Sequence, residues 1–260
     1  LVHSSPVAGQ PGRNSMRAEV DLSYRAYADA VKDVPPMVFS GAGHMIHAFF
    51  PNASSRDGYT FNDQDHSAGE EAWAYLPRNL HGRLRAFFSD DFSQMRSAEP
   101  ALMDARCRLT EAKLDLDQAA DRGGWSMVLV CPMGKGGRYL VALDVTDPTG
   151  PLPIWEFSHP DLGETWSIPA LGRVATSNTE SRDAVIVASG VDNVVGAPGP
   201  GQDRWRNDVP AVMVIDLASG RTLKTWRKPH LAGQAVFADV SAIDHSGDGL
   251  IDLAYIGTSG

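Results

Sequence analysis

The residues best suited to chemistry lie near the carboxy-terminal end of the chain, in a short segment rich in side-chain oxygens. Asp244, Ser246 and Asp248 recur at every second position, and Asp252 follows four residues later. A calcium loop uses oxygen ligands at alternate positions, a glycine at a sharp turn, a backbone carbonyl and a late carboxylate. The spacing therefore predicts a Ca²⁺ site.

The remaining positions of this loop agree with the pattern. When Asp244 is counted as position one, Gly249 stands at the sharp turn and Leu250 offers its carbonyl at position seven. The predicted metal ligands are Asp244, Ser246, Asp248, Leu250 and Asp252. Position twelve is Tyr255 where an EF-hand has Glu, so the loop is of a shorter type closed by Asp252. Magnesium is less favoured, because it prefers octahedral geometry and keeps several waters. A plain Asp- and Gly-rich turn is the alternative, since these residues also favour turns.

The charge of the loop predicts how a cation would act on it. Three carboxylates more than neutralise one Ca²⁺, and without a cation they should repel one another and resist closing the turn. Calcium is therefore expected to order the loop and the strand Leu253–Ile256 that follows it. Ser246 supplies a neutral oxygen where a carboxylate is commoner, so the affinity is expected to be lower than that of an all-Asp loop.

The whole chain limits the classes of function. Its 260 residues suffice for one large domain or two small ones, and 25 Gly and 17 Pro indicate many turns. The net charge of −9 disfavours nucleic acid as a partner, because phosphate binding needs a basic face. No run of about eighteen apolar residues predicts a membrane span. Leu1–Val7 resembles a strand rather than a signal peptide, so the chain is expected to be cut from a longer protein, with an equally abrupt end at Gly260.

Brief apolar or alternating runs between turn residues predict a mainly β protein. The predicted strands are Met37–Ser40, Met45–Phe50, Ala72–Leu76, Ser126–Val130, Tyr139–Asp144, Ile154–Phe157, Ala184–Ala188, Ala211–Asp216, Thr222–Trp226 and Leu253–Ile256. A short helix is predicted at Ser23–Lys32 and a weaker one at Leu114–Asp121. Long polar insertions are expected at Asn52–Gly69 and Val191–Asp208.

A weak internal repeat indicates how these strands are arranged. Each unit is a strand ending near Asp or Phe, a glycine turn and a second strand, which carries Trp73, Trp155 or Trp226. Repeated antiparallel units are typical of β-propeller blades, and a generic β-sandwich is the alternative. The predicted fold is all-β: a modified β-propeller of antiparallel blades with long loop insertions and one or two short helices. We expect one domain over residues 1–260, incomplete at both ends.

Six segments resemble one known family when they are taken in order. They are LVHSSPV at Leu1–Val7, MVFSGAGHMIHAF at Met37–Phe49, GEEAWAYLP at Gly69–Pro77, LDVTDP at Leu143–Pro148, LGETW at Leu162–Trp166, and Val240–Ile256 with the calcium loop. Nearly end to end, the chain resembles the carboxy-terminal β-propeller of the PilC/PilY-type proteins of the type IV pilus tip. It departs from the family pattern at Gly41–His44, which is one residue shorter, and at Ser246.

The resemblance implies a function, a location and partners. It implies a calcium-binding propeller of a pilus tip adhesin and biogenesis factor at the bacterial cell surface, which passes through the periplasm and outer membrane. Such a protein supports pilus assembly, the balance of extension and retraction, twitching motility and adhesion. Its expected partners are minor pilins at the pilus tip and a host or abiotic surface. The surface location and the strand-like flanks also lead us to expect a disulfide between Cys107 and Cys131, whereas the residues alone leave two free thiols open.

Other candidate sites are weaker. His44 and His47 are three apart and should point to opposite faces of a strand, so a turn His44 and a packed His47 are expected. Met133–Gly137 lacks the Ser or Thr and the helix that follow a phosphate loop, and is expected to be a β-turn. Asn62–Asp65 lacks a turn glycine and a closing acid, and is expected to be a solvated loop.

We assign no catalytic residue, because the nucleophile elbow of a serine hydrolase is missing. The alternative functions are a quinoprotein dehydrogenase, whose propeller has similar Trp-bearing repeats, and an extracellular propeller with a purely structural calcium loop. An adjacent cysteine pair, which many quinoproteins place beside the quinone, is missing from the sequence.

Overall fold

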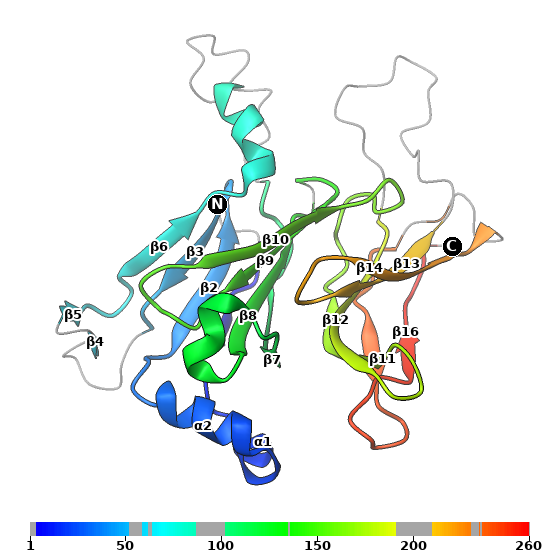
Figure 1. The fold of residues 1–260 in the computed structure, drawn as a ribbon. Helices are drawn as coiled ribbons and strands as arrows, with labels where there is room; N and C mark the ends of the chain where they lie inside the picture. The colour runs from blue at the N-terminus through cyan, green and yellow to red at the C-terminus, as the bar shows by residue number, and fades with distance from the viewer. Residues whose placement is uncertain are drawn as a thin grey trace.

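Three four-stranded antiparallel sheets stand side by side in the computed structural model of the chain (Figure 1). The structure describes residues 4–51, 59–61, 64–86, 102–134, 136–190, 210–229, 234 and 236–259. We call the three sheets blades 1, 2 and 3. In each blade the strands are hydrogen-bonded in the order in which the chain makes them, so every blade is a simple meander.

The strands have the following bounds. Blade 1 contains β1 (Val7–Gly9), β2 (Met37–Ala42), β3 (Met45–Phe49) and β6 (Glu71–Tyr75); blade 2 contains β7 (Arg108–Lys113), β8 (Trp125–Pro132), β9 (Tyr139–Asp144) and β10 (Leu152–Ser158). Blade 3 contains β11 (Ala170–Ala175), β12 (Ser181–Ala188), β13 (Ala211–Asp216) and β14 (Thr222–Arg227). Two small hairpins complete the described strands, β4 (Tyr59–Phe61) with β5 (Gln64–His66) and β15 (Ser241–Ile243) with β16 (Leu253–Tyr255). The helices are α1 (Ser15–Val20), α2 (Leu22–Ala30) and the 3₁₀ helices η1 (Arg78–Ala86) and η2 (Asp117–Arg122).

The first strand of each unit lies near the first strand of the next. Thus β1 contacts β7, β7 contacts β11, and β11 contacts β15. Such contacts place the innermost strands around a common axis, with the later strands of each blade farther out, which is the arrangement of propeller blades.

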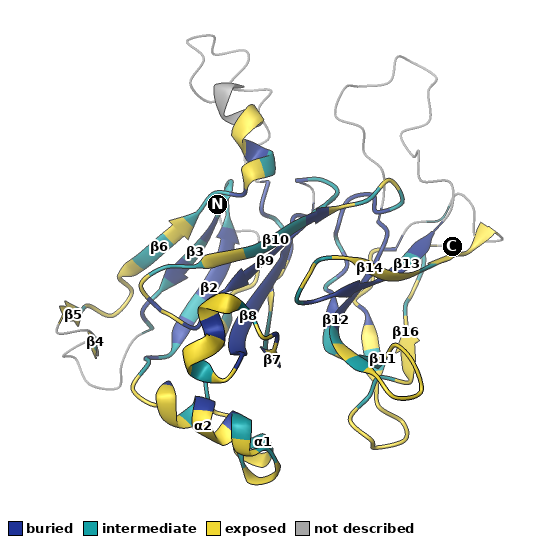
Figure 2. Ribbon diagram, viewed as in Figure 1, coloured by how far each residue is buried: buried dark blue, intermediate teal, exposed yellow. Residues whose placement is uncertain are grey.

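Blade 2 is the centre of the hydrophobic core, because both of its faces are covered (Figure 2). Every residue of β8 is buried, which explains why this strand is continuously apolar. Met127 and Leu129 belong to the cluster shared with blade 1, whereas Val128 and Val130 belong to the cluster shared with blade 3.

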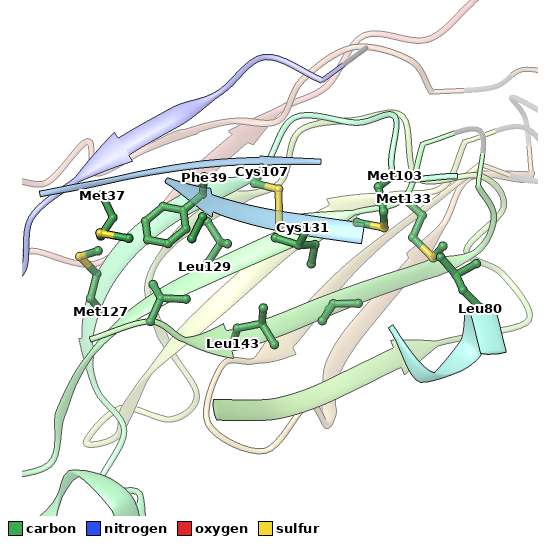
Figure 3. Close-up of a cluster of buried hydrophobic side chains, with 14 of the residues drawn as sticks. Met37, Phe39, Leu80, Met103, Cys107, Met127, Leu129, Cys131, Met133 and Leu143 are labelled. Atoms are coloured by element: carbon green, nitrogen blue, oxygen red, sulfur yellow. A yellow bond between two sulfur atoms is a disulfide. The ribbon is translucent and has the colours of Figure 1, made fainter. Parts of the chain in front are cut away.

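The predicted disulfide is present in the first of these clusters. Cys107 and Cys131 are bonded, with their Cα atoms 4.3 Å apart, and both residues are buried. Figure 3 shows the bond among Phe39, Leu129 and other apolar side chains. The prediction is confirmed. The bond can form because Cys131 lies on β8 and Cys107 directly precedes β7, next to the cross-strand pair Arg108 and Val130.

The internal repeat corresponds to the third and fourth strands of each blade, and its tryptophan has a packing role. Trp155 of β10 donates a hydrogen bond from Nε1 to the Leu217 carbonyl, at 2.8 Å, in the β13–β14 turn of blade 3. Its ring lies against Gly220, where an added Cβ would be only 2.8 Å from Trp155 Cγ and where φ is +70°. The tryptophan of one blade thus docks on the glycine turn of the next.

The repeated aspartate closes the third strand. Asp144 Oδ1 accepts hydrogen bonds from the Thr146 N–H (3.0 Å) and hydroxyl (2.6 Å). Asp144 Oδ2 accepts from Ser126 Oγ at 2.8 Å and from Arg122 Nη2 at 3.0 Å. The buried carboxylate therefore has several partners and fixes the turn, as expected for Asp followed two residues later by Thr.

All ten predicted strands are found, with small shifts at their ends. The predicted helix Ser23–Lys32 is α2, which begins one residue earlier and is capped by Asp21. The interval Leu114–Asp121 forms the 3₁₀ helix η2 rather than an α-helix. Asp115 has a positive φ of 51° and the N–H groups of residues 114 and 115 donate to the Gly124 carbonyl, so the chain turns here before a longer helix can form.

Some expectations fail or lie outside the described residues. The opening strand expected at Leu1–Val7 begins only at Val7, because Val7–Gly9 pairs with β2, and residues 1–3 lie outside the description. The insertion Val191–Asp208 also lies outside it, as does Gly260, whereas the described part of Asn52–Gly69 contains the β4–β5 hairpin.

Candidate functional site

The predicted calcium loop connects β15 to β16, the hairpin that follows blade 3. Ile243 pairs with Leu253 at the base of the loop, and the Asp252 N–H donates to the Ile243 carbonyl at 3.0 Å. The side chains of Asp244, Ser246, Asp248 and Asp252 are all exposed. The site is therefore a surface loop that is open to an ion from solvent.

Asp244 is the centre of the loop's hydrogen bonds. Its Oδ1 accepts from the N–H groups of Gly247 (2.6 Å) and Asp248 (3.2 Å), and its Oδ2 accepts from the Gly249 N–H at 2.7 Å. Three consecutive backbone amides thus wrap around one carboxylate. These donors offset part of the charge repulsion that the sequence predicts, and they close the turn.

Asp252 binds the other side of the loop in the same way. Its Oδ2 accepts from the N–H groups of His245 and Ser246, both at 2.8 Å. The hydrogen bond from the Ser246 N–H is the main reason that the pKa of Asp252 lies below its usual value, with the His245 N–H contributing less. Asp252 is therefore held as an ionised carboxylate, which is the form that binds a cation.

The other predicted ligands lie in the same turn. Asp248 Oδ1 accepts from the Leu250 N–H at 2.9 Å, and Ser246 Oγ lies 3.4 Å from Asp244 Oδ1. Gly249 has φ of +86° and an added Cβ would meet no atom within 4 Å. The backbone angle, rather than space, is thus the reason for glycine at this position, as the loop pattern predicts.

The donor set fits calcium in its chemistry. At Asp252 and Asp248 the hydrogen bonds found among the described residues end on one carboxylate oxygen, Oδ2 and Oδ1 respectively, which leaves the other oxygen for an ion. Both oxygens of Asp244 already accept backbone N–H groups. Within the same residues, no group of three or more Asp, Glu, His or Cys side chains is arranged to hold a metal ion. The three carboxylates accept hydrogen bonds from backbone N–H groups, and binding of calcium would have to bring the carboxylates closer together.

The hairpin that carries the loop rests on blade 3. The Ile251 N–H donates to the Arg173 carbonyl at 2.8 Å, and the Val240 N–H donates to the Ile168 carbonyl at 3.1 Å. Ile251 packs with Ala170 and other residues of the third hydrophobic cluster. The loop is therefore linked to β11 by a backbone hydrogen bond and by side-chain packing.

Two of the three weaker candidate sites behave as expected where they are described. His44 lies in the β2–β3 turn, and His47 Nδ1 is 2.8 Å from Glu71 Oε1 on β6, so the two histidines form no joint site. Met133–Gly137 turns through a hydrogen bond from the Gly136 N–H to the Met133 carbonyl, at 3.1 Å, before β9 begins, although Lys135 lies outside the described residues. Within Asn62–Asp65, the first two residues also lie outside them, and the last two are exposed but belong to β5, where they pair with β4, rather than to a loop.

Two hollows were missed by sequence reasoning. A polar cavity of about 560 Å³ lies between α1, blade 2 and blade 3, and includes Arg17, Trp125 and Asp183. Burial raises the pKa of the Asp183 carboxyl. A second hollow, an apolar groove of about 800 Å³, lies between blade 3 and β16 and includes Trp226 and Ile251. Both are built from residues that are distant in sequence, so no local motif could have indicated them.

A search of the described part of the chain finds no helix that is long and apolar enough to cross a membrane. No family model matches the chain. Individual relatives do match, and they agree with one another.

The chain is 28% identical over 266 residues to the type IV pilus biogenesis factor PilY1 of Pseudomonas aeruginosa strain UCBPP-PA14, which covers 99% of this chain and 20% of that protein. It is 26% identical over 243 residues to PilY1 of strain PAO1, covering 90% of this chain and 17% of the relative. A PilY1 homolog of Xylella fastidiosa is 29% identical over 157 residues, covering 59% of this chain and 11% of that protein. The chain thus spans about a fifth or less of the length of these curated relatives.

The fold is shared with a solved structure. The crystal structure of the Pseudomonas aeruginosa PilY1 C-terminal domain superposes with a TM-score of 0.66 at 24% identity, and covers 98% of this chain and 43% of that one. The sequence prediction of a modified β-propeller is confirmed, and so is the resemblance to PilY-type pilus proteins.

Proposed function

We propose that this chain is the calcium-binding β-propeller of a type IV pilus tip adhesin and biogenesis factor. The observation that carries the pilus assignment is similarity along 99% of the chain to a protein named as a type IV pilus biogenesis factor. Those relatives are named as biogenesis factors and not as enzymes, which favours a binding and structural role. Because the chain covers about a fifth of such a protein, the activity of the whole relative is part of the proposal.

Calcium would be held by Asp244, Ser246, Asp248, Asp252 and the Leu250 carbonyl. The ion would supply positive charge to a loop in which each of the three carboxylates accepts hydrogen bonds from separate backbone N–H groups. Extracellular calcium modules bind with dissociation constants of roughly 10⁻⁴–10⁻³ M, and tighter sensors of roughly 10⁻⁷–10⁻⁵ M. At a calcium concentration of ten to one hundred times the dissociation constant, the folded state gains about 1.4–2.7 kcal/mol.

The biological role follows from the location of such a protein. The propeller is placed at the pilus tip on the cell surface, where its partners are minor pilins and a host or abiotic surface. There it supports pilus assembly, the balance of extension and retraction, twitching motility and adhesion. Calcium, by ordering the hairpin after blade 3, keeps the propeller in the form that these partners bind.

The main alternative is a quinoprotein dehydrogenase. Its Trp-bearing repeats are the reason for considering it, but Trp155 packs on Gly220 between two blades, which gives the tryptophan of this repeat a structural role. Purified protein that shows the absorbance of pyrroloquinoline quinone, or that oxidises an alcohol or aldehyde once quinone and calcium are added, would favour the enzyme.

The experiment that tests the proposed function compares two acid-to-alanine variants in the source bacterium. Asp248→Ala removes a predicted ligand, whereas Asp29→Ala removes the same charge from an exposed position on α2. We expect Asp248→Ala to reduce surface piliation and twitching at unchanged protein level, and Asp29→Ala to leave both intact.

Two other results would contradict the proposal. Normal piliation, twitching and attachment in a strain that lacks the protein would contradict the pilus assignment. If the strain without the protein were defective but Asp248→Ala behaved as the unsubstituted protein, the calcium loop would be a structural turn with no part in pilus function.

A further inference from the structure

The β15–β16 hairpin has too few residues to be stable alone. Each strand has three residues, and Ile243, Leu253 and Tyr255 are exposed. Isolated two-stranded hairpins are marginal in water, so this one depends on its contacts with the rest of the fold. Figure 1 shows it beside β11 of blade 3, and the two elements are in contact.

Ile251 contacts blade 3 both through a backbone hydrogen bond and through its side chain. The Ile251 N–H donates to the Arg173 carbonyl at 2.8 Å, and its side chain is seated on Gly172 of β11. A Cβ added to Gly172 would lie 2.7 Å from Ile251 Cδ1 and 3.3 Å from Ile251 Cγ1. Glycine at position 172 therefore leaves a socket for Ile251 on a strand where any other residue would project toward it.

The same residue directly precedes the last predicted calcium ligand. Asp252 accepts the N–H groups of His245 and Ser246 through its side chain, and donates its own N–H to Ile243. The backbone from Ile251 to Asp252 thus joins the carboxylate to the socket on β11 without an intervening residue. A change that fixes the Asp252 carboxylate also fixes the position from which Ile251 reaches Gly172 and Arg173.

We infer that Ile251, seated on Gly172, couples calcium binding in the loop to the order of β11 and so to the blade 3 face of the apolar groove. This inference rests on the proposed calcium site. The ion holds Asp252, Asp252 holds the backbone of Ile251, and Ile251 holds the hairpin on β11. Coupling of two events is reciprocal, so seating of Ile251 on Gly172 also tightens calcium binding by the same factor. Residues 251–254 and 256 line one side of the groove.

The test measures calcium binding by calorimetry and amide hydrogen exchange over residues 168–175, on the full chain with calcium and with a chelator. Ile251→Ala removes the side chain from the socket, and Gly172→Val fills the socket from the other side. Ile243→Ala is the matched control, since it truncates an isoleucine of the same hairpin that is 42% exposed. Asp248→Ala serves as the variant without a complete ligand set.

In the unsubstituted chain, calcium is expected to slow exchange over residues 168–175. Ile251→Ala and Gly172→Val should still bind calcium, about tenfold more weakly, and calcium should no longer slow exchange there. Ile243→Ala should behave as the unsubstituted chain.

Calcium-dependent protection of residues 168–175 that persists in both socket variants would overturn the coupling while leaving the calcium site intact. A chain that binds no calcium, with the same heats as Asp248→Ala, would overturn the proposed calcium site and the coupling together.

Discussion

Trp155 provides the most direct test of how the blades are held together. Its Nε1–H donates to the Leu217 carbonyl at 2.8 Å, and its ring covers Gly220, so replacing it acts on the contact between blades 2 and 3. Truncation of a buried tryptophan costs about 3–5 kcal/mol, and since Trp155 is only half-buried we expect about 3 kcal/mol for Trp155→Ala.

A second substitution separates the hydrogen bond from the ring contacts. Trp155→Phe retains an aromatic ring but loses the Nε1–H donor, which leaves the Leu217 carbonyl without it; Leu217 is 1% exposed. The expected cost is about 1–2 kcal/mol. For a chain of this size each kcal/mol lowers Tm by about 2–4 °C, so we expect falls of about 6–12 °C for Trp155→Ala and about 2–8 °C for Trp155→Phe.

Trp226→Ala is the matched control, measured by the same thermal unfolding assay. Trp226 is also on the fourth strand of its blade but is 45% exposed, so its truncation is expected to lower Tm by no more than about 4 °C. A double-mutant cycle with Gly220→Ala should show strong non-additivity, because both changes act on one contact. Equal falls in Tm for Trp155→Ala and Trp226→Ala would refute the view that Trp155 locks two blades together.

Three other results are expected. Replacing Cys107 and Cys131 by alanine should destabilise the chain by about 3–4 kcal/mol, because the bond joins residues 24 apart, and equal urea midpoints for the two proteins would contradict this. The lowered pKa of Asp252 favours the ionised carboxylate in the folded loop, so its contribution is present above the unfolded pKa of about 3.9 and is lost as the pH falls through the lower folded pKa. The ¹³C shift of the Asp252 side-chain carboxyl should therefore show its main transition below about pH 4, and a main transition of that carbon above about pH 5 would count against this role. Ser246→Asp should tighten calcium binding in calorimetry, because it adds a carboxylate ligand, and weaker or unchanged binding would remove Ser246 from the ligand set.

The strands were predictable from local pattern because their residues carry the signal themselves. The apolar run of β8 and the exact span Tyr139–Asp144 follow from burial on one or both faces. The element that replaced an expected α-helix, η2, depends on the positive φ of Asp115 and on the Gly124 carbonyl, which the residue pattern of 114–121 does not show. The helix α1 was missed because it has only six residues, Ser15–Val20; its N-cap is Asn14, whose Oδ1 accepts a hydrogen bond from the Arg17 N–H.

The candidate site was predictable in its residues but only in part in its geometry. Spacing alone places Asp244, Asp248 and Asp252 in one turn, and the positive φ of Gly249 agrees with the pattern. The backbone N–H groups that donate to these carboxylates could not be predicted, because a sequence gives the number of charges but not the direction of each N–H group. The seat of Ile251 on β11 was also hidden, since it joins residues nearly eighty positions apart.

Calcium titration of the purified chain tests the central claim most directly. The unsubstituted chain and Asp248→Ala, both first treated with a chelator, are titrated with CaCl₂ in a calorimeter, and the same samples are melted with and without the ion. We predict one saturable site in the unsubstituted chain, a rise in Tm with calcium, and loss of both in Asp248→Ala. Equal heats and equal melting temperatures in the two proteins would show that the loop from Asp244 to Asp252 is only a turn.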